Sequence, residues 1–397
     1  MLKKELTAAL AMMGVIAPFA AHADQPMSST SGQQKTAPAY TAGESVRTGD
    51  LPGAYNQSAN YKIDDSYDIY FTADFIYWNL QQDSMRVGNL LDPDSSGSLG
   101  LLNGENETVF NSGKYKPGFQ VGLGFNMNGM DGWNLYSEYT WYQNKHSNTV
   151  DAGSGEGIAL SFIKDGAPEG ITDDIVLANS VSTDSKYHFN NLNLELQRPF
   201  YFGRKLTANF GAGLRALWIS QTVTGSASGL TAYEADSSSS GTSIVGQSAS
   251  FHQKSWGLGP RFELDTNWML GWGFRILANI AESVLYTRYT TLTGKIDGGV
   301  SEVGTTADFT STVGGANDTE CSSSSNYNTL RAITETSLGL GWGSYFGDNN
   351  DFHFDITASY EFNIYWNQNM YGMVVNGHGS PGNTYLQGLN IAARFDF

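Results

Sequence analysis

The sequence predicts an all-β protein: a transmembrane antiparallel up-and-down β-barrel of about ten strands, with short periplasmic turns and long extracellular loops. Ten segments alternate apolar and polar residues with a period of two, which is the period of a β-strand. The gaps between these segments are alternately short and long, as in bacterial outer-membrane barrels. Charged residues make up 15% of the chain and aromatic residues 13%. Soluble domains carry about 25% charged residues, so this composition favours a lipid-facing surface.

Residues 1–23 have the pattern of a secretory signal peptide. Lys3 and Lys4 precede an apolar run from Leu6 to Ala20, and a small-x-small cleavage site follows. That run is shorter than the roughly 20 residues a membrane-spanning helix needs. Residues 24–65 are rich in Ser, Thr, Gln, Gly and Pro and lack an apolar period, which predicts a mostly disordered periplasmic leader. The barrel is therefore assigned to residues 66–397.

The first two predicted strands alternate without interruption. In Tyr67–Leu80, apolar residues occupy every odd position from Ile69 to Tyr77, and Asp74 lies on the opposite face. Tyr115–Met127 shows the same alternation, with glycines and amides opposite its apolar residues. A short turn containing Gly and Asp then predicts a hairpin.

The third and fourth predicted strands are Trp133–Lys145 and Lys186–Gln197. The third places aromatic residues and Leu outward. In the fourth, the aromatic residues are out of phase with the leucines that follow them. Because a strand keeps its apolar residues on one face, this phase change predicts a β-bulge near Asn190.

The fifth, sixth and seventh predicted strands are Lys205–Gln221, Phe251–Thr266 and Gly271–Tyr289. Each carries apolar residues at alternate positions. Pro260 is an awkward residue in the sixth strand, because it cannot donate to the ladder.

The last three predicted strands are Thr329–Gly343, Asp351–Trp366 and Asn383–Phe397. With an even number of strands, the first strand begins and the last strand ends on the same side of the membrane, which is the side of the short turns. Twelve or fourteen strands are the alternatives, if a long loop hides further strands such as Ile158–Lys164 with Asp174–Ala178.

None of the nine tryptophans lies in the middle of a predicted strand. Four lie beside short-turn ends, namely Trp133, Trp268, Trp272 and Trp342. Five lie toward long-loop ends, namely Trp78, Trp141, Trp218, Trp256 and Trp366. Amphipathic rings favour the membrane–water interfaces, so we expect two girdles of aromatic residues.

The formal net charge of −17 argues against nucleic-acid binding, which requires basic patches. Cys321 is the single cysteine and excludes an internal disulfide. His353 and Asp355 share a strand face, but no serine nucleophile motif accompanies them. No enzyme activity, metal site or cofactor is therefore predicted.

Charged residues on the predicted strands fall on the face opposite the apolar one. Arg or Lys on the lipid face would cost about 2–4 kcal/mol at mid-depth, so these side chains are expected to face the lumen. The predicted lumen-lining residues are Asp74, Glu138, Glu195, Arg215, Arg261, Glu263, Asp265, Arg275, Arg331, Glu335, Asp355, Glu361 and Arg394. They either form a closed ion network that fills a narrow lumen or line a water-filled constriction that prefers cations. Ten strands enclose little more than eight-stranded barrels, which side chains can fill, so a filled or very narrow lumen is favoured.

Several strand sequences resemble the Legionella-type major outer membrane protein family, which is related to chlamydial major-outer-membrane-protein-like porins. The matching stretches are Ala73–Trp78 (ADFIYW), Lys116–Gly124 (KPGFQVGLG), Asp131–Tyr136 (DGWNLY) with Tyr139–Trp141 (YTW), Trp256–Arg261 (WGLGPR) and Leu264–Trp268 (LDTNW). The resemblance covers most of residues 66–397, mainly in the strands.

The resemblance implies a pore-forming protein of the bacterial outer membrane. The expected function is passive diffusion of small hydrophilic solutes or ions. The alternative is a structural or adhesion protein with a plugged lumen, acting through its extracellular loops. Expected partners are outer-membrane lipid and lipopolysaccharide, the barrel-assembly machinery through the C-terminal strand ending at Phe397, and further copies of the chain in a homo-oligomer.

Overall fold

The computed structural model describes most of the predicted barrel. The residues described are 58–61, 63, 68–91, 107–110, 113–127, 130–154, 156–160, 175–233, 242–299, 321–322, 327–347, 351–375 and 380–397. The predicted signal peptide, most of the predicted leader and the Ser-rich stretches of the long loops lie outside these residues.

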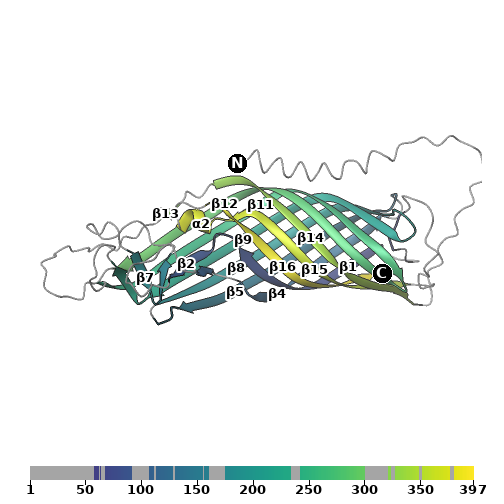
Figure 1. Cartoon of the computed structure of the whole chain (residues 1–397). Coiled ribbons are helices and arrows are strands. Elements are labelled where there is room, and N and C mark those ends of the chain that lie inside the picture. Colours follow the sequence, from purple (N-terminus) through teal and green to yellow (C-terminus); the bar gives the residue numbers. More distant parts are fainter. Residues whose placement is uncertain are drawn as a thin grey trace, which may run out of the picture. The chain divides into compact units, whose positions relative to one another are not determined.

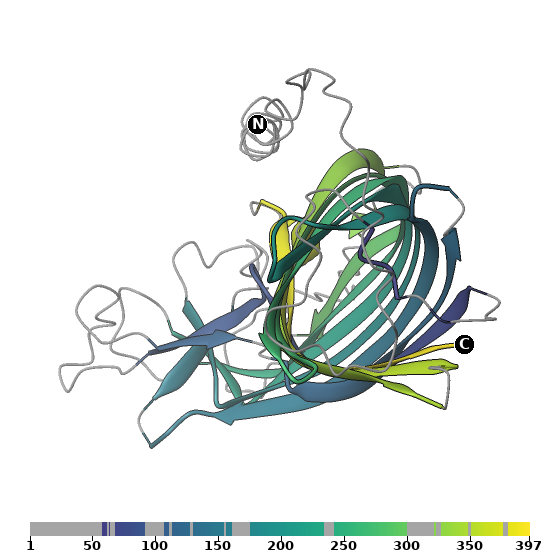
Figure 2. The same cartoon turned by 90° about the vertical axis from the view of Figure 1, so that its right-hand side faces the viewer.

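Ten long antiparallel strands form one closed barrel (Figures 1 and 2). They are β1 (Ile69–Gln82), β4 (Tyr115–Met127), β5 (Trp133–Asp151), β8 (Ser180–Tyr201), β9 (Leu206–Ser228), β11 (Thr242–Gly271), β12 (Phe274–Gly299), β14 (Tyr327–Phe346), β15 (Phe352–Asn369) and β16 (Gly382–Asp396). Each pairs with the next in chain order, and β16 pairs with β1, with Phe71 opposite Phe395. The predicted fold class and the count of ten strands are confirmed.

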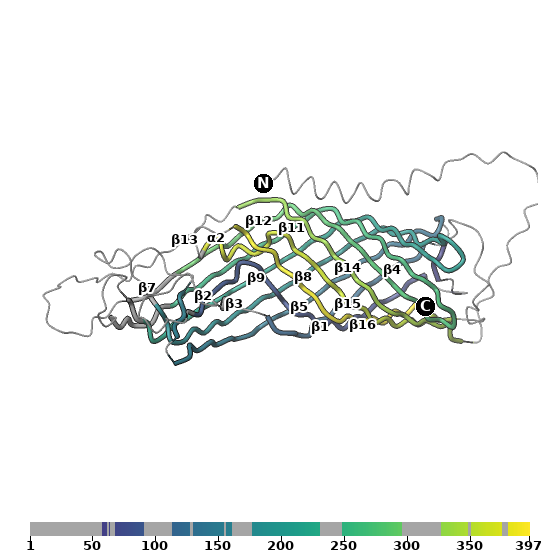
Figure 3. Tube along the Cα trace, viewed as in Figure 1, coloured from purple at the N-terminus to yellow at the C-terminus, as the bar shows by residue number. Residues whose placement is uncertain are grey.

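Several strands run beyond their predicted ends on the long-loop side (Figure 3). β11 begins at Thr242 and β12 continues to Gly299, whereas the apolar alternation had placed these ends at Phe251 and Tyr289. The added residues are mostly small or polar. Backbone pairing continues there without the apolar signal, because these segments extend past the lipid.

Of the two segments that could have added strands to the barrel, the described parts (residues 158–160 and 175–178) form short strands outside the barrel wall, and the rest lies outside the described residues. A small sheet joins β10 (Leu230–Tyr233), β7 (Ile175–Ala178), β6 (Gly157–Leu160), β2 (Arg86–Leu91) and β3 (Glu107–Phe110), in that order, to the long-loop end of β11. β13 (Cys321–Ser322) pairs with β12. A five-residue helix, α2 (Tyr371–Val375), follows β15. The alternatives of twelve or fourteen barrel strands are therefore wrong.

The outer surface of the barrel is apolar. Among the exposed side chains, Phe71, Leu214 and Leu338 are 50%, 54% and 63% accessible. In the part of the chain that the structure describes, no helix has the length and hydropathy to cross a membrane.

The predicted bulge near Asn190 is wrong. β8 keeps a continuous register with β5 and β9 through this position. Tyr187 and Phe189 lie on the lumen face and are 0% and 1% exposed, while Leu194 lies on the outer face and is 46% exposed. The phase change arises because the lumen itself is apolar at this level, so the strand carries apolar residues first on its inner face and then on its outer face.

Trp78 departs from the predicted girdle for the same reason. Its ring is 2% exposed and packs inside the lumen with Ile76 and Leu80 of the same strand. The assignment of Trp78 to a membrane interface is therefore wrong.

Candidate functional site

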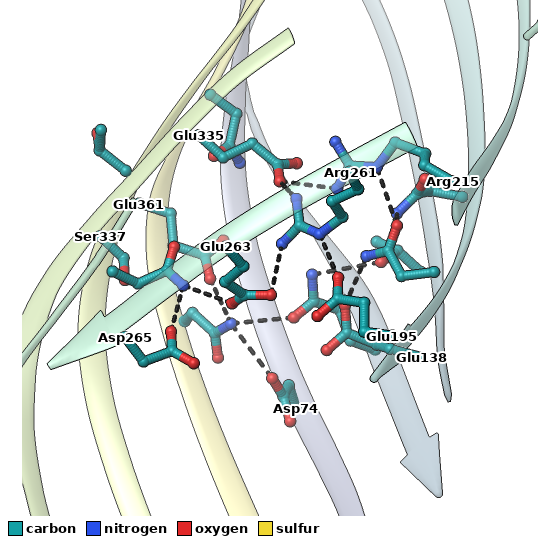
Figure 4. Close-up of a pocket in the computed structure, with 18 of the residues that line it drawn as sticks. Asp74, Glu138, Glu195, Arg215, Arg261, Glu263, Asp265, Glu335, Ser337 and Glu361 are labelled. Atoms are coloured by element: carbon teal, nitrogen blue, oxygen red, sulfur yellow. Dashed lines mark hydrogen bonds and ion pairs between the residues drawn. The ribbon is translucent and has the colours of Figure 1, made fainter. Parts of the chain in front are cut away.

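The middle of the lumen contains a polar cavity of about 220 Å³ (Figure 4). Nine of the predicted lumen residues line it: Asp74, Glu138, Glu195, Arg215, Arg261, Glu263, Asp265, Glu335 and Glu361. Their strands present them inward because each stands an even number of residues from other inward positions. The cavity therefore brings seven carboxyl groups and two guanidinium groups together from seven strands.

Arg261 is the centre of one half of this network. It is 6% exposed and lies on β11. Its guanidinium donates to Glu195 and Glu335, and its Nη2 is 3.1 Å from Glu263 Oε2 (Figure 4). Because one guanidinium can serve several carboxylates in a fixed fork, Arg261 ties β8, β11 and β14 together through the lumen.

Arg215 on β9 completes this half. Its Nη2 is 2.7 Å from Glu335 Oε2, and its Nε donates to Asn193 Oδ1 at 2.9 Å. β9 and β14 are separated by two other strands of the wall. This ion pair therefore crosses the lumen instead of running along its wall.

The carboxyl groups of the other half contact neutral partners. Asn390 Nδ2 donates to Glu361 Oε1 at 2.6 Å and to Asp74 Oδ2 at 3.3 Å. The Tyr136 hydroxyl donates to Glu138 Oε2 at 3.1 Å. Amide nitrogens of Asn209 and Asn279 donate to Asp265. Within the described residues, none of these four acids forms an ion pair, so the cavity carries an acidic surplus.

An aromatic layer closes the lumen on the long-loop side of the cavity. Trp78, Phe189 and Tyr365 belong to a cluster that also includes aliphatic residues from β9, β12, β14 and β16. The rings of Phe189 and Tyr365 meet edge to face with centroids 5.5 Å apart. β8 and β15 are five strands apart in either direction around the ten-stranded wall. Contact between them therefore spans the lumen from side to side.

Arg331 lies beyond the aromatic layer and does not line the cavity. Its Nε donates to the Tyr289 hydroxyl at 3.1 Å, and its Nη2 is 3.4 Å from Met370 Sδ. Met370 follows β15 in a segment that folds into the mouth of the barrel and is fully buried. Arg331 therefore fixes this segment at the long-loop end.

The remaining predicted residues form ion pairs at the short-turn end. Arg275 Nη1 is 2.6 Å from Asp355 Oδ2, and Arg394 Nη2 is 2.6 Å from Asp396 Oδ1. His353 Nδ1 lies 3.2 Å from Asp396 Oδ2. These contacts join β12, β15 and β16 below the cavity.

Part of the predicted leader crosses this end of the barrel. Ala59 N donates to Pro199 O at 3.0 Å, and Asn60 Nδ2 donates to Gly132 O at 2.9 Å. Tyr61 stacks on His353 with centroids 3.7 Å apart and donates its hydroxyl to Asp355 Oδ2 at 3.3 Å. Burial raises the pKa of the Tyr61 hydroxyl, so it stays protonated as a donor.

Sequence reasoning missed the amides and aromatic rings that complete the lumen. Asn193, Asn390, Phe189 and Tyr365 lie at inward positions of their strands, in phase with the predicted charges. Strand parity could have identified them. In the described part of the chain, no group of three or more His, Cys, Asp or Glu residues is arranged to hold a metal ion.

Several solved structures are similar to this chain in arrangement but have low sequence identity to it. The outer membrane protease OmpT from Escherichia coli is 8% identical, with 85% of this chain and 99% of that chain covered and a TM-score of 0.33. The Pseudomonas putida toluene transporter TodX is 8% identical, with 88% and 99% covered and a TM-score of 0.24. A Pseudomonas aeruginosa FadL homologue is 8% identical, with 84% and 91% covered and a TM-score of 0.23. These likenesses carry no argument about function.

A search of curated proteins found no matching relative. A family model described as the Legionella pneumophila major outer membrane protein precursor matches residues 64–397. This range contains all ten strands of the barrel wall and the whole lumen network, and it places the protein in the bacterial outer membrane. The chain belongs to the family of the Legionella pneumophila major outer membrane protein.

Proposed function

We propose that this outer-membrane protein is a narrow channel for small hydrophilic solutes and ions. The observation that carries the proposal is that the lumen contains a polar cavity, although the layer of the lumen next to it on the long-loop side is filled with apolar side chains. Replacing buried ion pairs by well-packed apolar residues is often neutral or stabilising. The chain fills the next level in that way, with Trp78, Phe189 and Tyr365. The need to fill the lumen with side chains therefore does not explain why the residues of the cavity are charged. Contact with hydrophilic solutes does explain it.

The proposal includes a preference for cations. Seven carboxyl groups and two guanidinium groups line the cavity, and within the described part of the chain four of these acids form no ion pair. A constriction lined by charge of one sign concentrates ions of the opposite sign. The acidic surplus therefore supports entry of cations in preference to anions.

Passage requires the aromatic layer to open, because Phe189 and Tyr365 meet across the lumen. The test is single-channel conductance of the full chain in planar bilayers. Wild-type protein is expected to give small steps, and Phe189→Ala/Tyr365→Ala larger or longer ones. The matched control is Phe352→Ala/Phe395→Ala, which removes a stacked aromatic pair on the lipid face, with centroids 5.7 Å apart. The control should conduct like the wild type.

The second candidate is a plugged structural or adhesion protein that acts through its extracellular loops. The contact of Phe189 with Tyr365 across the lumen favours it. Folded wild-type protein and folded Phe189→Ala/Tyr365→Ala would then both be silent in the bilayer. That result would exclude the channel and support the plugged scaffold.

The group of ion pairs at the short-turn end of the barrel, which includes His353 and Asp355, has a structural role in this proposal. His353 is held between Tyr61 and Asp396, and Asp355 is paired with Arg275. No catalytic step is included. Recognition of β16 by the barrel-assembly machinery, cleavage of a signal peptide and assembly into a homo-oligomer remain predictions.

A further inference from the structure

Basic side chains gather on the lipid-facing side of the barrel just beyond its external aromatic girdle. The ladder places Trp141, Asn190, Trp218 and Trp256 in one row across β5, β8, β9 and β11. Two residues further toward the long-loop ends, the next row is Gln143, His188, Ser220 and Lys254. Two residues beyond, the row is Lys145, Lys186, Thr222 and His252. These positions share the parity of exposed residues such as Leu194, Trp218 and Leu258, so they face outward.

Lys145 and Lys186 are direct cross-strand partners. Side chains in such a pair have Cβ atoms about 5 Å apart, and like charges placed there destabilise the sheet. Both lysines are exposed, as is Lys254. Among the residues that the structure describes, none of the three forms an ion pair. In a chain of net charge −17, this arrangement gathers positive charge on one surface. The acid on the same face, Asp184, lies two residues beyond Lys186 and accepts a hydrogen bond from Ser147.

Neighbouring polar residues hold the histidines of this surface in place. The Nε2 atom of His188 is 3.1 Å from Gln143 Nε2. The Nδ1 atom of His252 is 2.9 Å from Thr222 Oγ1. The surface thus carries groups that can donate hydrogen bonds, in two successive rows that run across β5, β8, β9 and β11.

The depth of these rows matches lipid headgroups. Tryptophan girdles lie at the headgroup level of a membrane, and two residues of strand add about 7 Å along the chain. Long loops of outer-membrane barrels face the outside, so the basic rows lie in the outer leaflet. Below the girdle, the exposed side chains of Leu194, Leu214 and Leu258 offer an apolar surface to acyl chains.

We propose that Lys145, Lys186, His188 and Lys254, here called the basic face, bind the phosphate groups of a phosphorylated glycolipid of the outer leaflet. Phosphate oxygens between Lys145 and Lys186 would remove the repulsion of that pair and accept charge-assisted hydrogen bonds. The acyl chains of the same lipid lie on the apolar surface below. This inference rests on the outer-membrane location of the chain and is independent of the proposed channel.

The test measures binding of bisphosphorylated lipid A to the full chain in detergent, by native mass spectrometry or thermophoresis. Each lysine near an anionic lipid contributes roughly fivefold in affinity, so Lys145→Gln/Lys186→Gln should bind about 25-fold more weakly. The matched control is Arg204→Gln/Lys205→Gln, which removes the same charge from two exposed residues at the β8–β9 turn on the opposite side of the membrane. The control should change affinity less than about twofold. Lys145→Arg/Lys186→Arg should bind like the wild type and shows that the site tolerates substitution.

Three outcomes would overturn the proposal. One is an equal loss of affinity in the Gln variant and the control. Another is equal binding of lipid A from which both phosphates have been removed, which would point to the apolar surface alone. The third is complete displacement of lipid A by millimolar inorganic pyrophosphate, which would indicate a site for free phosphate and not for a lipid.

Discussion

The change of Arg261 to Gln tests whether the lumen network stabilises the barrel. Arg261 is 6% exposed and is the shared partner of Glu195, Glu263 and Glu335. Gln can keep one hydrogen bond but brings no charge. After the change, Glu335 keeps Arg215 as its partner, whereas Glu195 and Glu263 keep contacts with side-chain amides and with each other but with no cation.

The expected cost is large because the carboxylates stay buried when their cation is removed. Breaking a buried pair by removing one partner costs about 3–5 kcal/mol. The matched control is Arg198→Gln. Arg198 pairs with Asp131 at 2.9 Å, but Asp131 is 76% exposed, and exposed pairs contribute about 0–1 kcal/mol. The two variants remove the same side chain and should differ by at least about 2 kcal/mol.

The assay is reversible urea unfolding of the barrel in phospholipid vesicles, followed by tryptophan fluorescence in both directions. Glu195→Gln added to Arg261→Gln should restore about 1 kcal/mol or more, because it removes one of the unpaired charges. If Arg261→Gln costs no more than Arg198→Gln, or if the second change restores nothing, the carboxylates are not held by Arg261 in the way described.

Three further predictions address packing, the leader and ion preference. A Cβ atom at Gly213 would lie 2.0 Å from the backbone oxygen of Leu194, whereas the nearest atoms to one at Gly211 would be the side-chain atoms Gln197 Cγ at 3.1 Å and Glu195 Oε2 at 3.3 Å. In the same urea titration, Gly213→Ala should therefore cost about 1–3 kcal/mol more than Gly211→Ala, and equal costs would contradict the close approach of β8 and β9. Tyr61→Ala should lose about 1–2 kcal/mol through its contacts with His353 and Arg394, while Tyr61→Phe should lose about 1 kcal/mol or less; indistinguishable variants would mean that ring stacking does not anchor the leader. Reversal potentials across a KCl gradient should show a cation preference at low salt, weaker in Asp74→Asn/Glu361→Gln and lost near 1 M, where the Debye length is about 3 Å. An anion preference in wild-type protein would refute the acidic-surplus argument.

The sequence by itself determined the barrel, its strand count and its two surfaces. A period of two assigns each side chain to one face, and the chain must place charges such as Arg261 and Glu335 away from lipid. The same rule failed at Tyr187 and Phe189, where apolar residues were assumed to face lipid, and the expectation of aromatic girdles failed at Trp78, which lies in the lumen. Alternation with a period of two shows which side chains share one face of a strand, but it does not show which face contacts water and which contacts apolar groups.

Only the tertiary structure decided which lumen residues meet. Arg261 and Glu195 are 66 residues apart in the chain, and Phe189 meets Tyr365 from the opposite side of the wall. These contacts depend on the closure of the sheet and on the tilt and stagger of its strands, which fix the level at which each inward residue stands. Periodicity within a strand carries no information about that level. The sequence therefore predicted a charged lumen. Closure of the barrel divides that lumen into an acidic cavity, an aromatic layer, the contacts of Arg331 at the long-loop end and the ion pairs at the short-turn end.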